Sequence, residues 1–156
     1  MKVILTLCLL LCGIFGFSQN NHLPPNNVTQ SFQREYPKSH PSDWKQSNDG
    51  GWSVSFDDND HNNGEVMAYY SKSGKHYDTH IPYDKKDVPS TVSDHMQKHY
   101  GSTGDYEYTR IDRPGENSVY LTHYKHKNNY KAVYVNKEGH EKEYHDKYHD
   151  NQNQHY

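Results

Sequence analysis

Apolar residues along this chain follow helical spacing in two places and alternating spacing in several others. In residues 28–36 every fourth position is apolar, which places these side chains on one face of a short helix that Pro37 ends. Apolar Trp52, Val54 and Phe56 then alternate with serines, which is typical of a β-strand that turns one face inward. This part of the chain therefore predicts a helix followed by strands.

Alternating or apolar runs predict two groups of strands, separated by a second helix. The first group is expected to open at Trp44 and to include residues 52–56, 66–70 and 75–81, with Pro82 ending it. The second group is expected at residues 106–111, 118–125, 130–135 and 140–144.

The second helix is predicted from one apolar stripe, formed by Val92, Met96 and Tyr100. Asp87 or Ser90 is expected to cap its start, because short polar side chains accept hydrogen bonds from the first free N–H groups. Gly101 is expected just after its last turn, where positive φ is common. The order along the chain is therefore helix, strands, helix, strands.

The helix pattern and parts of the strand pattern recur after 64 positions. Matching residues are Val28 and Val92, Trp44 and Tyr108, Ala68 and Ala132, Tyr70 and Tyr134, and, one position later, Gly74 and Gly139. This recurrence predicts two tandem repeats, at residues 28–87 and 88–145. The expected fold class is α+β, with each repeat a helix packed on an antiparallel β-sheet of about four strands. Because one helix covers one sheet face, the other face is left for solvent, a neighbouring repeat or a partner.

Residues 1–18 are expected to be a secretory signal peptide. Lys2 makes the start basic, residues 3–17 are mostly apolar, and small residues precede a cleavage site near Ser18-Gln19. The apolar run is shorter than the roughly 20 residues that cross a bilayer, so we expect no membrane insertion after cleavage. The mature protein is expected to be periplasmic or secreted, to begin with a flexible lead-in at residues 19–27, and to contain no cysteine.

Composition changes which residues can form the core. Only 31% of residues are hydrophobic, and the chain holds 15 Tyr but 4 Phe, so tyrosine has to supply much of the core and of any binding surface. The formal net charge is −3 with both signs interspersed, which indicates neither nucleic acid nor a membrane surface as a partner. The sequence carries no motif for nucleotide binding or nucleophilic catalysis, so we expect no enzyme and no cofactor.

Three segments carry a resemblance to a known family: SFQREYP ahead of Trp44, WSVSF followed by VMAYYSKSG, and IPYDKKDVPSTVSDHMQKHY. They resemble the PepSY-like, β-lactamase-inhibitor-like (BLIP-like) proteins that Bacteroidetes export. The family's aromatic hairpin, A-x-Y-x-x-x-G, is matched at residues 68–74 and, one residue longer, at 132–139. Where the family often has Asp after the second aromatic residue, this chain has Ser71 and Val135. The resemblance covers about residues 28–145 and implies a non-enzymatic binding module whose sheet meets a protein target.

Tyrosines on the predicted strands are candidates for partner binding. Tyrosine is enriched at interfaces because it combines a large apolar area with few rotatable bonds and a polar hydroxyl. We expect an unknown protein partner in the envelope or outside the cell. The residues expected to contact it are Tyr69, Tyr120, Tyr124, Trp44 and Tyr108. The alternative is that these side chains form the core of a chain poor in Phe and Leu.

Histidines near the C-terminus suggest metal binding as a different function. His145 and His149 are four positions apart at the start of a polar, His-rich tail, residues 146–156, and imidazoles at this spacing on a helix would bind zinc or copper. With 13 His in the chain, such spacings also arise by chance. The leading hypothesis is an exported, non-enzymatic binding module, such as a protein inhibitor or accessory protein. The alternative hypothesis is a periplasmic metal-binding protein.

Overall fold

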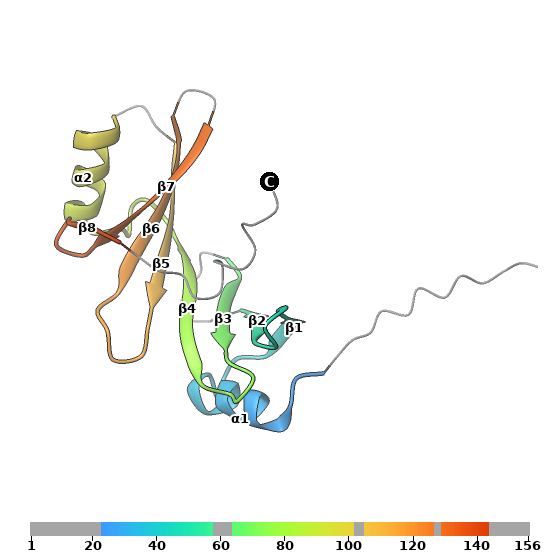
Figure 1. Cartoon of the computed structure of the whole chain (residues 1–156). Coiled ribbons are helices and arrows are strands. Elements are labelled where there is room, and N and C mark those ends of the chain that lie inside the picture. The colour runs from blue at the N-terminus through green and yellow to red at the C-terminus, as the bar shows by residue number, and fades with distance from the viewer. Residues whose placement is uncertain (1–22, 58–63, 102–104, 127–128, 144–156) are drawn as a thin grey trace, which may run out of the picture.

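The structure is an α+β fold with two helices, which confirms the predicted α+β class, and its strands form one antiparallel sheet of eight rather than a separate sheet of about four for each helix (Figure 1). It is a computed structural model and describes residues 23–57, 64–101, 105–126 and 129–143. The predicted signal peptide and polar tail lie outside the described residues. The strands lie side by side in chain order. The elements are α1 (Asn26–Glu35), β1 (Pro41–Gln46), β2 (Trp52–Phe56), β3 (Val66–Tyr70), β4 (His76–Tyr83), α2 (Ser90–Tyr100), β5 (Tyr106–Asp112), β6 (Val119–His126), β7 (Asn129–Asn136) and β8 (Glu141–Lys142).

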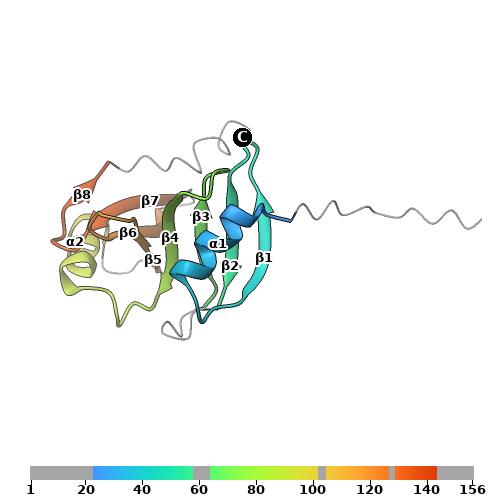
Figure 2. The same cartoon turned by 90° about the horizontal axis from the view of Figure 1, so that it is seen from below.

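Both helices lie on the same face of the sheet. Directly opposite residues of antiparallel strands share a face, and the register carries this face from Ile81 through Arg110 to Tyr120. α1 covers the part formed by β1 to β4, and α2 covers the part formed by β5 to β7 (Figure 2). The core beneath α1 consists of Val28, Phe32, Trp52, Val54, Phe56, Val66, Ala68, Tyr70 and Ile81. The core beneath α2 consists of Val88, Val92, Met96, Tyr108, Tyr120, Tyr124 and Val135.

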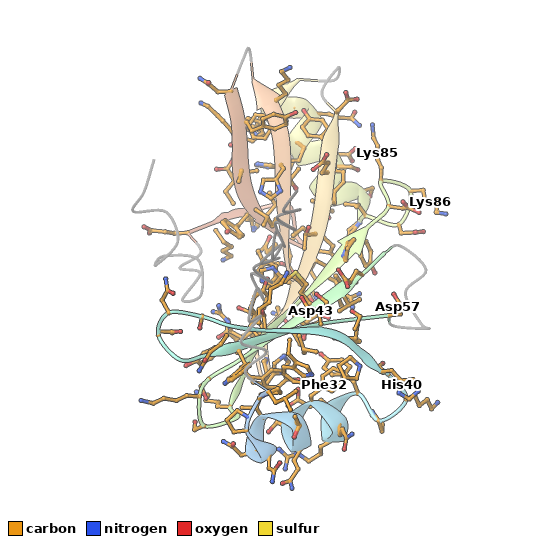
Figure 3. The ribbon with its side chains drawn as sticks, turned by 90° about the vertical axis from the view of Figure 1, so that its right-hand side faces the viewer. Phe32, His40, Asp43, Asp57, Lys85 and Lys86 are labelled. Carbon is orange, nitrogen blue, oxygen red and sulfur yellow. The ribbon has the colours of Figure 1, made fainter. Side chains whose placement is uncertain are left out.

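Phe32 is the central side chain of the first core. α1 buries Val28 and Phe32 on one side, as their helical spacing predicts. Figure 3 shows Phe32 between α1 and the sheet, where its ring centroid lies 5.0 Å from that of Phe56 and 5.7 Å from that of Trp44. Burying an aromatic side chain of this kind contributes roughly 1.5–3 kcal/mol, so this contact does much to hold α1 on the sheet.

The start of α2 differs from the prediction. Asp87 and Ser90 are the predicted N-caps, but Pro89 holds that position and no side chain caps the helix. The reason is that Ser90 already lies in the first turn, where the Val92 N–H donates to the Pro89 carbonyl at 2.9 Å. Gly101 ends the helix with a φ of 100°, as expected for glycine at this end.

Pro82 does not end the first group of strands, contrary to the prediction. It lies inside β4, opposite Thr109 of β5. Proline lacks the N–H that a central strand needs, but among the described residues β4 pairs with β3 only as far as His80. Beyond His80, β4 pairs with β5 on one side and with no described strand on the other. Pro82 therefore lies in a part of β4 that resembles an edge strand, where proline is tolerated.

Ser53 and Ser55 are buried, although the alternating pattern predicts that β2 turns only one face inward. Their opposite residues on β3 are Tyr69 and Met67, whose larger side chains flank the small serines. β2 is therefore buried on both faces, and the sheet face away from the helices is closed at this point.

Two glycines let a hairpin touch the first turn of each helix. Gly74, between β3 and β4, and Gly139, between β7 and β8, have φ values of 81° and 82°. A Cβ atom at Gly74 would lie 2.6 Å from the Asn27 carbonyl oxygen of α1, and one at Gly139 would lie 2.8 Å from the Thr91 carbonyl oxygen of α2. Each helix also donates a hydrogen bond to its hairpin, from Asn27 Nδ2 to Lys72 O (3.3 Å) and from Thr91 Oγ1 to Lys137 O (2.5 Å).

Alanine at Gly74 or Gly139 should lower the free energy of unfolding more than alanine at Gly115. All three glycines have φ of 79° to 82°, which costs an L-residue about 1–2 kcal/mol. A Cβ atom at Gly115 would have no neighbour within 4 Å, so Gly115→Ala isolates this backbone cost. At the other two positions the clash with the helix should add about 1–3 kcal/mol, measured by urea unfolding. Equal losses at all three positions would show that the helix contact contributes nothing.

Replacing Thr122 by valine should stabilise the protein by about 1 kcal/mol. The Thr122 hydroxyl is fully buried and finds no hydrogen-bond partner among the described residues, and burying such a group costs about 1–3 kcal/mol. Thr79 is the matched control, because its buried hydroxyl contacts Tyr36 (2.5 Å) and His76 (2.9 Å). Thr79→Val should therefore destabilise the protein. Urea unfolding would contradict this account if both variants shifted stability in the same direction.

Candidate functional site

No described helix covers the sheet face opposite α1 and α2. At the β5–β7 end of this face the side chains of Glu107, His123, Tyr130 and Ala132 are exposed, and the strand register places them together. Tyr130 is 76% exposed, and in the described part of the chain the one other large hydrophobic side chain that is exposed is Leu23. This end of the sheet therefore presents an aromatic side chain among polar neighbours.

Strand β7 also has an open stretch of edge. β8 is short and pairs with β7 at Tyr134 and Val135. Along residues 129–133, β7 pairs with β6 on one side, and none of the described strands pairs with it on the other side. Backbone N–H and C=O groups on such an edge can pair with another strand, and Tyr130 lies within this stretch.

The five residues predicted to bind a partner do not form one surface. Tyr108, Tyr120 and Tyr124 are buried in the core beneath α2. Trp44 is half-buried against the core beneath α1. Tyr69 is buried too, but on the opposite sheet face, beside Ser53. Burial gives these side chains a packing role, and partner binding by them stays a prediction.

Tyr130 is absent from the residues predicted to bind a partner, although the sequence contains a signal for it. Val133 and Val135 of the same strand pack against the core beneath α2. Because side chains alternate along a strand, Tyr130 and Ala132 point to the opposite face. The two valines therefore mark the inward face of β7, and Tyr130 and Ala132 lie on its outward face.

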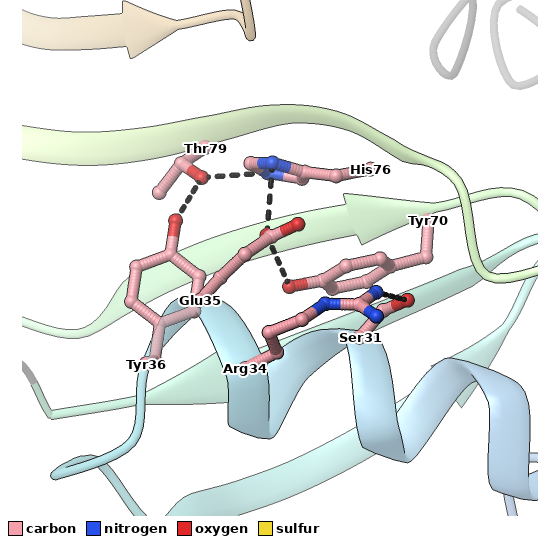
Figure 4. A network of polar contacts seen from close by, with 7 residues as sticks. All are labelled: Ser31, Arg34, Glu35, Tyr36, Tyr70, His76 and Thr79. Carbon is pink, nitrogen blue, oxygen red and sulfur yellow. Dashed lines mark hydrogen bonds and ion pairs between the residues drawn. The ribbon is translucent and has the colours of Figure 1, made fainter.

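A polar network joins the end of α1 to β3 and β4 (Figure 4). His76 Nδ1 lies 3.0 Å from Glu35 Oε2, and His76 Nε2 lies 2.9 Å from Thr79 Oγ1. The Tyr70 hydroxyl donates to the same Glu35 oxygen at 3.2 Å, and the Tyr36 hydroxyl lies 2.5 Å from Thr79 Oγ1. Burial, followed by the charge of Glu35, raises the pKa of Tyr70 far above its ordinary value, so its hydroxyl stays protonated and acts as a donor.

The order Glu35, His76, Thr79 is that of carboxylate, imidazole and hydroxyl in hydrolase triads. Thr79 is only 2% exposed, however, and its hydroxyl also contacts Tyr36. A substrate carbonyl would reach Thr79 Oγ1 only if α1 separated from the sheet. The network therefore ties α1 to the sheet, and we assign it no catalytic role.

A related cluster lies where α2 meets β8. Glu141 Oε1 accepts a hydrogen bond from the Tyr100 hydroxyl at 2.6 Å and lies 2.9 Å from His95 Nε2. The bond with Tyr100, followed by that with His95, holds the pKa of Glu141 below its ordinary value, and the first of these bonds raises the pKa of Tyr100 to about 12. His99 stacks on His95 with ring centroids 4.4 Å apart. The cluster therefore combines two imidazoles with an ionised carboxylate.

These residues border an open pocket of about 520 Å³ between α2 and the β7–β8 hairpin. Its lining includes His95, His99, His140, Glu138 and Glu141. As the side chains stand, the His, Cys, Asp and Glu residues that the structure describes form no group of three or more around a metal position. The predicted metal ligands His145 and His149 lie outside the described residues.

The protein resembles known proteins in fold rather than in sequence. No family model and no curated protein matches its sequence. A DUF2874 family protein from Bacteroides ovatus is 17% identical, with a TM-score of 0.67 over 76% of this chain and 84% of that chain. A BLIP-like protein from Bacteroides fragilis is 13% identical, with a TM-score of 0.66 over 77% of this chain and 86% of that chain.

A third solved structure has a similar fold. It is a candidate periplasmic protein from Bacteroides eggerthii, 14% identical, with a TM-score of 0.67 over 76% of this chain and 86% of that chain. None of these three proteins is described as an enzyme. Of the helices in the described residues, none has the length and apolar character needed to cross a membrane. The chain has the fold of BLIP-like and DUF2874 proteins of Bacteroides, which confirms at the level of the fold the BLIP-like resemblance carried by its sequence.

Proposed function

We propose that this protein is an exported, non-enzymatic binding module that docks a protein partner at the β7 end of its open sheet face. The observation that carries this proposal is Tyr130, which is 76% exposed on the face opposite the helices and lies beside the edge of β7. Export is supported by the signal-peptide pattern of residues 1–18 and by the candidate periplasmic neighbour. A non-enzymatic role is supported by the lack of catalytic motifs in the sequence.

The chemistry of this surface favours a protein as the partner. Tyr130 supplies a large apolar area at a low cost in side-chain entropy. The edge of β7 supplies backbone groups to which an extended segment can add as a strand, and Glu107 and His123 supply a polar rim. The partner we propose is an envelope enzyme, by likeness to the neighbour described as BLIP-like, or another secreted protein.

We also propose that residues 28–87 and 88–145 are two copies of one unit. The matching approach of Gly74 and Gly139 to the first turns of α1 and α2 supports this proposal. So does the hydrogen bond that each first turn donates to the hairpin carbonyl two residues before the glycine. A helix contact made at the same place in both halves is what duplication of one unit would produce.

Tyr130→Ala should remove partner binding and leave the fold unchanged. Mature protein with a non-histidine tag would serve as bait in envelope extract, and captured proteins would be quantified by mass spectrometry. We expect capture of the main stoichiometric partner to fall about tenfold or more, because an exposed aromatic at an interface centre often dominates affinity. The urea-unfolding midpoint should not move.

Leu23→Ala is the matched control for this experiment, because Leu23 is 84% exposed but precedes α1, away from β7. It should capture the partner as the unsubstituted protein does. Capture should also survive a chelator, since the proposed contact uses no metal. Equal capture by Tyr130→Ala and Leu23→Ala would contradict the proposed site.

Tyr120→Ala and Tyr124→Ala should instead destabilise the protein. Both side chains are buried beneath α2, and truncating a large buried aromatic side chain costs about 3–5 kcal/mol. Tyr130→Ala, at an exposed position, should change the free energy of unfolding by less than about 0.5 kcal/mol. Urea unfolding of the three variants measures this difference. A Tyr120→Ala protein as stable as the unsubstituted one would return Tyr120 to the partner-binding candidates.

A further inference from the structure

Two histidines of α2 and one glutamate of β8 come together where the helix meets the strand. His95 and His99 are four positions apart, so their side chains lie on one side of the helix. Their ring centroids are 4.4 Å apart, and His95 Nε2 lies 2.9 Å from Glu141 Oε1. Two imidazoles and a carboxylate are a ligand set typical of zinc and related divalent metals. We propose that His95, His99 and Glu141 bind a divalent transition-metal cation such as Zn²⁺.

The distance between two of the proposed ligands is close to that found in a metal site. With bonds of about 2.1 Å to a tetrahedral Zn²⁺, two ligand atoms lie about 3.4 Å apart. The pair of His95 Nε2 and Glu141 Oε1, at 2.9 Å, therefore has to open only slightly to admit the cation. The rings of His95 and His99 are stacked with centroids 4.4 Å apart, so they have to separate and reorient before one nitrogen of each reaches the same cation.

Metal binding requires a small rearrangement of the side chains. In their hydrogen-bonded form the described His, Cys, Asp and Glu side chains do not surround a single metal position. His99 is exposed and lines the pocket, and its ring has to rotate about its own side-chain bonds to reach a cation held by His95 and Glu141. The pocket of about 520 Å³ holds the cation together with a water molecule or His140 as a fourth ligand.

Glu141 is oriented and charged for this role. The Tyr100 hydroxyl donates to Glu141 Oε1 at 2.6 Å, and hydrogen bonds of this kind orient metal ligands from outside the coordination sphere. The negative charge of the Glu141 carboxylate favours a cation beside the two imidazoles.

The corresponding place on α1 lacks the paired imidazoles. The residues 64 positions before His95 and His99 are Ser31 and Glu35. Among the described residues Glu35 contacts one histidine, His76 on β4, whose ring nitrogens already contact Glu35 and Thr79. The proposal therefore applies to the α2 side of the molecule and does not extend to α1.

Isothermal titration calorimetry of the mature protein with Zn²⁺, without a histidine tag, tests the site. We expect one Zn²⁺ site, and we expect His99→Ala and Glu141→Gln each to weaken the Zn²⁺ affinity at least about tenfold. Losing a metal ligand should lower the affinity by no less than losing a residue that only orients a ligand. His123→Ala is the control, because His123 is exposed on the sheet face opposite α2 and should leave Zn²⁺ affinity unchanged. The imidazole proton resonances of His95 and His99 should shift on addition of Zn²⁺.

A second variant separates this site from the tail. Replacing His145, which directly precedes the tail, and the tail residues His149 and His155 by asparagine should leave the Zn²⁺ site intact. The proposal is overturned if Zn²⁺ binding disappears in that variant, persists unchanged in His99→Ala, or is absent from the mature protein. Circular dichroism and urea unfolding check that each variant folds. If His99→Ala does not fold, Glu141→Gln and the resonance shifts decide the question.

Discussion

The close contact between each hairpin and the first turn of its helix fixes how near the helices lie to the sheet. Gly74 and Gly139 lie so near helix carbonyl oxygens that no side chain fits at either position. Helices held at this distance bring Phe32 and Met96 fully into the sheet cores. Interiors are close-packed, so a helix displaced by even one methyl group would lose contacts along its whole buried side.

Tyrosine forms much of the core, and this explains why polar networks lie between the helices and the sheet. A buried hydroxyl needs a hydrogen-bond partner, and the ends of a helix offer unpaired groups. Tyr36, Tyr70 and Tyr106 all place their hydroxyl groups at a helix–sheet junction. The hydroxyl of Tyr108 is the exception, because within the described residues it is buried without a partner.

The placement of both helices on one face makes the two faces of the sheet chemically different. The covered face takes the tyrosines of β5 and β6 into a core, whereas the opposite face presents Tyr130 to solvent near the end of β7. The junctions also differ between the halves. Glu35 on α1 meets His76 on β4, whereas His95 on α2 meets Glu141 on β8. In the second pair the imidazole and the carboxylate exchange elements, and the helix residue lies one turn before His99, the position that matches Glu35. That exchange leaves two histidines together on α2.

Local patterns in the sequence specify the elements, their order and the inward side of each helix, because helical and alternating spacing are local properties of the chain. Two helices and eight strands were predictable to within a few residues, and Gly74 and Gly139 stood out through their recurrence. Which face of a strand is covered depends on how the strands and helices pack together. Tyr120 and Tyr130 both lie in alternating strands, yet cross-strand register buries the first and exposes the second. The pairing of His95 with Glu141 was hidden for the same reason, since contacts between distant residues form only when the strands and helices pack together.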